Sequence, residues 1–165
     1  MKFQLVDKIQ SIAPGRRIVT IKALSLAEEY LADHFPAFPV LPGVLMIEAM
    51  VQAAAWLVRI QQDFANSIVI LRAARNVKYT SFVQPGSILR CELEAMEIGP
   101  SSAKFKGAGY VGDRQTVSGR LELECFNVVG RPGGSAAADA AIVAQLRQRF
   151  RLIGGPEALA AAGAD

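Results

Sequence analysis

Apolar and polar positions change their spacing along this 165-residue chain, and the changes predict its secondary structure. Between about 67 and 128, apolar residues alternate with polar ones in runs separated by Pro, Gly, Ser and Asp, which is the period of half-buried strands. We expect four strands there, at about 67–80, 87–98, 102–112 and 115–128, and an earlier one at 16–24. In two of these runs, alternate positions place one set of side chains on a single face: Leu89, Cys91, Leu93 and Ala95, and Val117, Gly119, Leu121 and Leu123.

The stretch from Gly43 to Gln62 has a different pattern, with apolar residues at every phase of the 3.6-residue period. It contains mostly strong helix formers and no internal Gly or Pro, which predicts a long buried helix. Residues 25–33, ahead of it, are expected to form a loop or a short helix. The chain therefore predicts an α+β fold in which an antiparallel sheet wraps around one central helix.

The character of the chain changes after residue 129, where Gly, Pro, Ser and Ala replace the alternating pattern. We divide the chain into a domain at 1–129, a linker at 130–141, and a C-terminal helix with a flexible tail at 142–165. The helix is amphipathic and is expected to dock on the core or on a neighbouring subunit, more than on a separate partner or a membrane surface. Its apolar positions are Ile142, Leu146, Phe150 and Ile153.

Composition narrows the functional classes. Hydrophobic residues make up 52% of the chain and charged residues 20%, which favours oligomerisation for a chain of this size. The net charge of +3 comes from scattered basic residues, so nucleic acid is not an expected partner. Glu48 and Gln52 interrupt the longest apolar stretch, and the N-terminus does not resemble a signal peptide, so we expect no membrane span and a cytoplasmic location.

Cys91 and Cys125 lie in separate strand-like runs, with no spacing typical of a zinc site or a disulfide framework. Because the chain has a single histidine, metal binding is not expected either. We interpret both cysteines as reduced thiols.

Candidate chemistry begins with Glu48 and Gln52, the only polar side chains between Val44 and Leu57. A carboxylate in an apolar helix is costly unless it is paired, protonated or used in chemistry. Glu48 and Gln52 are four residues apart and share a helix face, so the amide can hydrogen-bond the carboxyl group. Apolar surroundings would also favour the protonated carboxyl group, which makes Glu48 a candidate proton donor.

His34, the only histidine, opens a Pro-rich loop that runs to Pro42 and Gly43. The free N–H groups at the start of the helix would suit an oxyanion, and His34 would supply a base. A solvated histidine or an ion-paired glutamate would explain either residue alone. The combination favours an acid–base site.

These residues resemble the hot-dog-fold 3-hydroxyacyl-acyl-carrier-protein dehydratases. The signature of that family is a His-Phe-Pro loop, a Pro-Gly turn and a Glu-Ala-Met-x-Gln helix, seen here from His34 to Gln52. A glutamate at this position resembles the branch that only dehydrates, whereas the dehydratase–isomerase branch typically carries aspartate. The similarity covers roughly 3–128 and includes further landmarks at 5–9, 14–19, 76–79 and 85–86.

The resemblance implies a role for each matched residue. His34 would remove the α-proton of a thioester, Glu48 would protonate the departing 3-hydroxyl, the Gly43 N–H would polarise the carbonyl, and Gln52 would orient Glu48. It also implies an acyl group carried on the 4′-phosphopantetheine of acyl carrier protein, with no other cofactor and no metal. The His and Glu of one site would come from different subunits of a homodimer, with a trimer of dimers as the next assembly that the family allows.

The chain also departs from the family pattern. Ala37-Phe38 replaces a common Gly-Arg pair, so Phe38 is expected at the substrate pocket, its rim or the dimer interface. The basic cluster that usually follows Asn76 is thinner, which leaves Arg75 and Lys78 as candidates for carrier docking.

Two other functional classes are also compatible with the sequence. A hot-dog thioesterase would use an acidic residue of the same helix to position water, although the His-Phe-Pro loop is typical of elimination chemistry. A non-catalytic acyl-binding or carrier-binding homologue is the other, although the set of His34, Gly43, Glu48 and Gln52 is intact.

Overall fold

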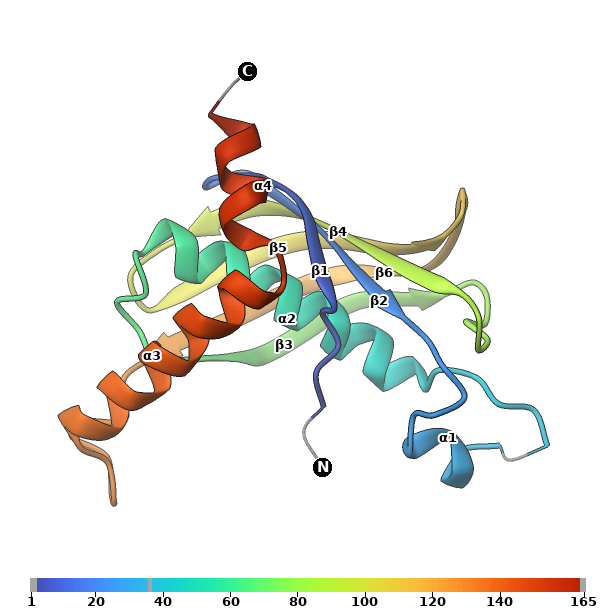
Figure 1. Cartoon of the computed structure of the whole chain (residues 1–165), viewed down its shortest axis with the longest axis horizontal. Coiled ribbons are helices and arrows are strands. Elements are labelled where there is room, and N and C mark those ends of the chain that lie inside the picture. Colours follow the sequence, from blue (N-terminus) through green and yellow to red (C-terminus); the bar gives the residue numbers. More distant parts are fainter. Residues whose placement is uncertain (1–2, 36, 164–165) are drawn as a thin grey trace.

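The computed structural model describes residues 3–35 and 37–163. Six antiparallel strands form one sheet in the order β1-β2-β4-β5-β6-β3, which curves around the long helix α2 (Figure 1). The expected fold class is confirmed. The strands are β1 Lys8–Ala13, β2 Arg17–Ala23, β3 Ile68–Tyr79, β4 Ile88–Ile98, β5 Ser102–Val111 and β6 Arg114–Phe126.

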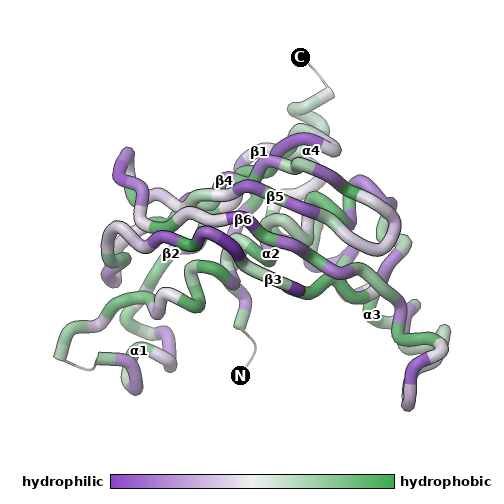
Figure 2. Tube along the Cα trace, turned by 180° about the vertical axis from the view of Figure 1, so that it is seen from behind, coloured by the Kyte–Doolittle hydropathy of each residue, from purple (hydrophilic) through white to green (hydrophobic). Residues whose placement is uncertain are grey.

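Helix α2, Gly43–Gln61, lies against the concave face of the sheet, and most of the core is formed between them. The strands place alternate residues toward α2. Figure 2 shows how hydrophobic and hydrophilic residues alternate along the strands. The strands expected after residue 67 are present within two residues of their expected ends, and their expected inner faces are buried except at Ala95, which is half-buried.

Strand β1 was not expected from the sequence. Only Ile9 and Ile12 are fully buried in it, three residues apart, because the pairing with β2 shifts register between Ile9 and Ser11. This irregularity removes the period of two that marks a strand in the sequence.

Helix α2 is long and apolar enough, by length and composition alone, to cross a membrane, which the sequence reading did not expect. Inside the fold, 61% of its 18-residue apolar window is buried. The apolar composition of α2 is therefore also that expected of a central core helix.

The loop between α1, Tyr30–Asp33, and α2 is anchored by two buried residues, Val40 and Leu41. The Leu41 N–H donates to the Val83 carbonyl oxygen at 2.8 Å, which ties the loop to the segment between β3 and β4. The end of this loop that leads into α2 is therefore fixed.

The C-terminal part of the chain is more ordered than the sequence indicated. Helix α3, Ala136–Leu152, begins six residues before the expected start at 142, because Ser135 caps it: Ala138 N–H donates to Ser135 Oγ at 3.1 Å. Asp139 accepts hydrogen bonds from the Val128 and Val129 N–H groups and fixes α3 to the end of β6. The alanines of the predicted linker form the first turns of this helix.

Helix α4, Gly155–Ala162, occupies the segment that was expected to be flexible, so that expectation is wrong. The Ile9 N–H of β1 donates to the Ile153 carbonyl oxygen at 2.7 Å, and Ala158 of α4 is buried. From α3, Phe150 packs against Trp56 and Phe64 with ring centroids 5.9 and 6.1 Å apart. The C-terminal helices therefore extend the core; Figure 1 shows α3 on the side of α2 opposite the sheet.

Candidate active site

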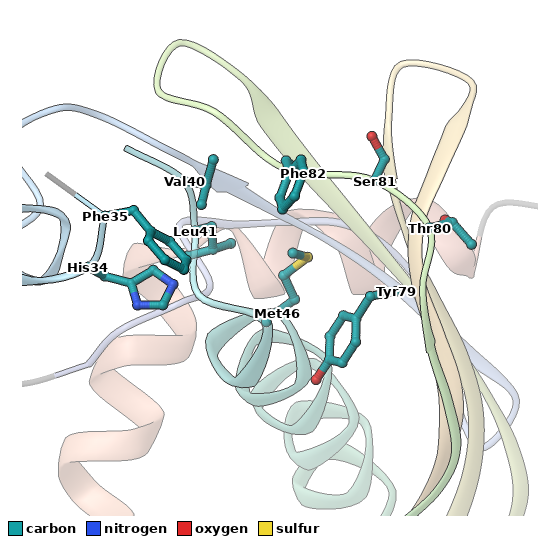
Figure 3. A pocket seen from close by; sticks show the side chains of 10 residues that line it. His34, Phe35, Val40, Leu41, Met46, Tyr79, Thr80, Ser81 and Phe82 are labelled. Carbon is teal, nitrogen blue, oxygen red and sulfur yellow. The ribbon is translucent and has the colours of Figure 1, made fainter. Parts of the chain in front are cut away.

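A pocket of about 310 Å³ lies at the N-terminus of α2 (Figure 3). Three segments form it: the loop after α1, the first turn of α2, and the end of β3 with the residues that follow. The lining residues are His34, Phe35, Val40, Leu41, Gly43, Met46, Tyr79, Thr80, Ser81 and Phe82.

His34 is half-buried at the edge of this pocket, with its ring against that of Phe35 at 4.5 Å between centroids. Phe35 adopts a left-handed backbone conformation, with φ of 51°, and its carbonyl oxygen accepts from the Phe38 N–H at 2.8 Å. Left-handed conformations are uncommon for bulky residues and are concentrated at functional sites. This tight turn directs the His34 imidazole toward the start of α2, as Figure 3 shows.

Gly43 is the first residue of α2, and no acceptor for its N–H is found among the described residues. A Cβ atom at this position would lie 2.9 Å from Cε1 of Tyr79, so the aromatic ring reaches the backbone only because residue 43 is glycine. Helix N-terminal N–H groups favour negative charge. An oxygen that gains charge in this pocket would therefore meet a free donor.

Tyr79 is a pocket residue that the sequence reading did not assign to the site. The pairing of β3 with β6 shifts register between Arg75 and Lys78, and Asn76 at the shift has a φ of 53°. A bulge of this kind redirects the side chains that follow it, and asparagine tolerates the left-handed conformation. The sequence signal for this arrangement is Asn76, which lies three residues before an aromatic residue at the end of the predicted strand.

Glu48 and Gln52 make the expected contact: Gln52 Nε2 donates to Glu48 Oε1 at 2.9 Å. The same amide group also donates to the Phe3 carbonyl oxygen at 3.0 Å, while its Oε1 accepts from the Leu5 N–H at 2.9 Å. Gln52 is thus held by the N-terminal segment and in turn holds one oxygen of the carboxyl group. Glu48 itself is half-buried in one chain.

His34 and Glu48 do not share a pocket within one chain. Glu48 is absent from the pocket lining, whereas Met46 of the same helix is part of it. Two residues correspond to about 200° around a helix axis, so these two side chains point to opposite faces of α2. One chain thus brings His34 to Gly43, and Glu48 to Gln52, as two separate half-sites.

Three further expected residues lie outside the pocket lining. Phe38 is 47% exposed, and its ring meets that of Phe82, a lining residue, edge-to-face at 5.6 Å. Arg75 Nε pairs with Glu122 Oε1 at 2.9 Å, whereas Lys78 is exposed beside the pocket residue Tyr79.

Cys91 and Cys125 are buried thiols, and burial raises the pKa of Cys91 to about 12. In the part of the chain that the structure describes, no group of three or more His, Cys, Asp or Glu side chains could hold a metal ion.

Known proteins similar to this chain were found by both sequence and structure. Residues 1–120 match the model of the FabA-like domain. The 3-hydroxyacyl-[acyl-carrier-protein] dehydratase FabZ of Clostridium kluyveri is 36% identical over 119 residues, which is 72% of this chain and 83% of that protein. FabZ of Pelotomaculum thermopropionicum is 39% identical over 121 residues, 73% of this chain and 85% of the relative.

Solved structures support the fold. The dehydratase heterocomplex ApeI:P from Xenorhabdus doucetiae aligns with a TM-score of 0.64 and 21% identity, over 75% of this chain and 84% of the other. A mutant thioesterase PA1618 from Pseudomonas aeruginosa aligns with a TM-score of 0.57 and 9% identity, over 72% and 79%. At these identities the likeness concerns the fold alone, but the matched domain model and the FabZ sequences show that this chain belongs to the FabA-like family.

Proposed function

We propose that this protein dehydrates (3R)-3-hydroxyacyl groups on acyl carrier protein to trans-2-enoyl groups, in fatty acid or related acyl-chain biosynthesis. The observation that carries the proposal is the placement of His34 beside the free N–H of Gly43 in one pocket. The FabZ relatives, which are 3-hydroxyacyl-[acyl-carrier-protein] dehydratases, support the choice of reaction.

In the proposed reaction, His34 takes the α-proton of the thioester, and the electron pair of that C–H bond forms the new double bond. The thioester oxygen gains charge as the proton leaves, and the Gly43 N–H stabilises it, a type of contact worth about 3 kcal/mol of barrier. Glu48 gives its proton to the departing 3-hydroxyl, so the C–O bond breaks and water leaves. Both proton transfers are made by side chains of the protein, and the acyl group stays on the phosphopantetheine arm throughout.

The separate half-sites support a homodimer as the catalytic unit. Since Glu48 lies on the face of α2 opposite Met46, the Glu48 beside His34 would come from the partner subunit. The two edge strands of the sheet are β1 and β3. Part of β1 is covered, because its Ile9 N–H donates to the Ile153 carbonyl oxygen. Strand β3 has twelve residues, and its Ile70 is 45% exposed. An open edge of this length suits pairing with a second copy of the strand. Further assembly into a trimer of dimers would leave this pairing unchanged.

Carrier docking is proposed at the mouth of the pocket. Lys78 is exposed beside Tyr79, where an acidic carrier would bring its pantetheine arm to His34. Arg75 shares its charge with Glu122, so its contribution would be the smaller one. We place this reaction in the cytoplasm.

The test uses 3-hydroxyacyl groups linked to acyl carrier protein, with enoyl product and free thiol measured separately. His34→Ala and Glu48→Gln should each lower the enoyl rate by about 10²-fold or more, because each removes a proton carrier. Glu29→Gln neutralises an exposed carboxylate beside α1 and should keep the wild-type rate.

Free thiol without enoyl product would instead identify a thioesterase. Retention of more than about a tenth of the wild-type rate by either site variant would contradict the assigned roles.

A further inference from the structure

A second cavity, of about 200 Å³, lies along the face of α2 that carries Gln52. The N-terminal segment, α2 and α3 form its walls, so it depends on a C-terminal helix beyond residue 120, where the family match ends. Its lining includes Val6, Gln52, Trp56, Arg59, Leu146 and Arg149.

Among the described residues, two arginines are the only charged ones that line this cavity. Arg59 comes from α2 and Arg149 from α3, and neither forms a salt bridge within residues 3–35 and 37–163. The eight ion pairs in the described part of the chain are all formed by other arginine and lysine side chains. Two cations that line one small cavity without a carboxylate repel each other, and a bound anion would remove that cost.

Of the two arginines, Arg59 has the more closely defined surroundings. Its Nε is buried without a hydrogen-bond partner in the described structure, and its Cζ lies 5.2 Å from the Trp56 ring centroid. Burial lowers the pKa of Arg59 to about 10, which leaves the guanidinium charged at neutral pH. A buried unsatisfied donor on a charged group is expensive, so this side chain favours an acceptor from a ligand.

Apart from the amide side chains of Gln4 and Gln52, the remaining walls are apolar. Trp56 is 5% exposed, and Val6 and Leu146 complete the surface around it. A cavity of 200 Å³ has room for roughly six or seven groups the size of water, at about 30 Å³ each. This volume fits a short alkyl chain better than a nucleotide, and planar guanidinium groups match the geometry of a carboxylate.

We propose that this cavity binds a short alkyl chain that ends in a carboxylate, with Arg59 and Arg149 on the carboxylate and Trp56 against the chain. Gln52 lines the same cavity and donates to Glu48, so an occupant contacts the residue that holds the proposed acid. The carboxylate could belong to a free fatty acid or to the far end of an acyl group bound at Glu48. The binding site itself does not rest on the proposed dehydratase activity.

The single tryptophan makes the test direct, because all tryptophan fluorescence of the protein comes from this cavity. The full chain is titrated with sodium pentanoate, whose seven non-hydrogen atoms match this volume, and with pentanol as the uncharged match. We expect a saturable change with pentanoate, at least tenfold weaker binding of pentanol, and a similar loss of pentanoate binding in Arg59→Gln and in Arg149→Gln. Arg151→Gln is the matched control, since Arg151 is in the same last turn of α3 and does not line this cavity.

Isothermal titration calorimetry of the same variants measures binding directly, so a change in fluorescence without a change in affinity is recognised. Arg59→Lys should retain part of the affinity because it keeps the charge. Absence of pentanoate binding, equal binding of pentanol, or unchanged binding by both arginine variants would overturn the proposal. The source of the ligand follows from inhibition of the enzyme: competition with the acyl substrate identifies the far end of the acyl group, and non-competitive inhibition identifies a free acid.

Discussion

A Cβ atom on Gly43 would lie 2.9 Å from Cε1 of Tyr79, closer than real Cβ contacts permit. Tyr79 is 51% exposed and ends β3, so its ring is held against the start of α2 from one side only. The glycine therefore serves two purposes: it leaves a free helix N–H in the pocket, and it gives the aromatic ring a place against the backbone.

Gly43→Ala should displace the Tyr79 ring and lower kcat/KM by about 10- to 100-fold, because a shift of about 1 Å at a reacting centre has effects of this size. In a Tyr79→Ala background the same substitution should cost much less, since the displaced ring is already absent. Steady-state kinetics of the two single variants and the double variant give this comparison. Gly99→Ala, where the nearest atom to a new Cβ is 3.4 Å away, is the control, and equal effects in both backgrounds would contradict the contact.

Gln52→Met should lower kcat about tenfold with little change in KM, because the amide positions Glu48 and does not contact the substrate in the proposed reaction. Stability should fall by about 2 kcal/mol, because the Leu5 N–H loses its acceptor. A loss of stability with unchanged kcat would show a purely structural role for Gln52.

Local patterns predicted most of the fold, and long-range packing accounts for what they missed. The regular alternation in β4 and β6 was enough to place Leu89 and Leu121 on the inner face. Strand β1 was missed because its bulge breaks the alternation, and α4 because its alanines resemble a flexible tail until β1 packs against them.

The candidate site divides in the same way. His34, Gly43 and Glu48 follow from one continuous motif. Tyr79 belongs to the site only because the bulge at Asn76, 33 residues after Gly43, directs the Tyr79 ring back toward α2. No local pattern encodes a contact between segments this far apart in the sequence.

Phe150→Ala should destabilise the whole protein by about 3–5 kcal/mol, because it removes the ring that packs on Trp56 and Phe64. Urea unfolding followed by circular dichroism measures the effect. Leu152→Ala, two residues along the same helix and 74% exposed, should change the free energy of unfolding by less than about 0.5 kcal/mol. Similar small effects for both variants would mean that α3 is not part of the cooperative core.

Phe38→Arg restores the charge that the family commonly has in this loop and removes the edge-to-face contact with Phe82. Because Phe82 lines the pocket, we expect a changed preference among acyl chain lengths or carriers, with the dimer preserved. Competing substrates and analytical ultracentrifugation separate the two readouts. A weaker dimer with a uniform loss of rate would place Phe38 in the subunit interface instead.

The two half-sites of one chain lead to the last prediction, which concerns subunit exchange. His34 lines the pocket and Glu48 does not, so in the proposed dimer a complete site combines His34 from one subunit with Glu48 from the other. Inactive His34→Ala and inactive Glu48→Gln proteins, mixed under conditions that exchange subunits, should therefore regain activity. In each mixed dimer one of the two sites receives both intact residues, and the other receives neither.

At equal concentrations and random exchange about half of the dimers are mixed, so recovery should approach about a quarter of the wild-type rate, given that each single variant loses about 10²-fold or more. Exchange is verified separately by mass spectrometry of differently tagged subunits. Gln52→Met mixed with Glu48→Gln is the matched control: both changes affect the same half-site, so every site with an intact His34 still faces an impaired acid, and recovery should not exceed the average of the two parents. Full exchange without recovery in the first mixture would show that His34 and Glu48 act within one chain, which would require α2 to present Glu48 to the pocket on the face that Met46 now occupies.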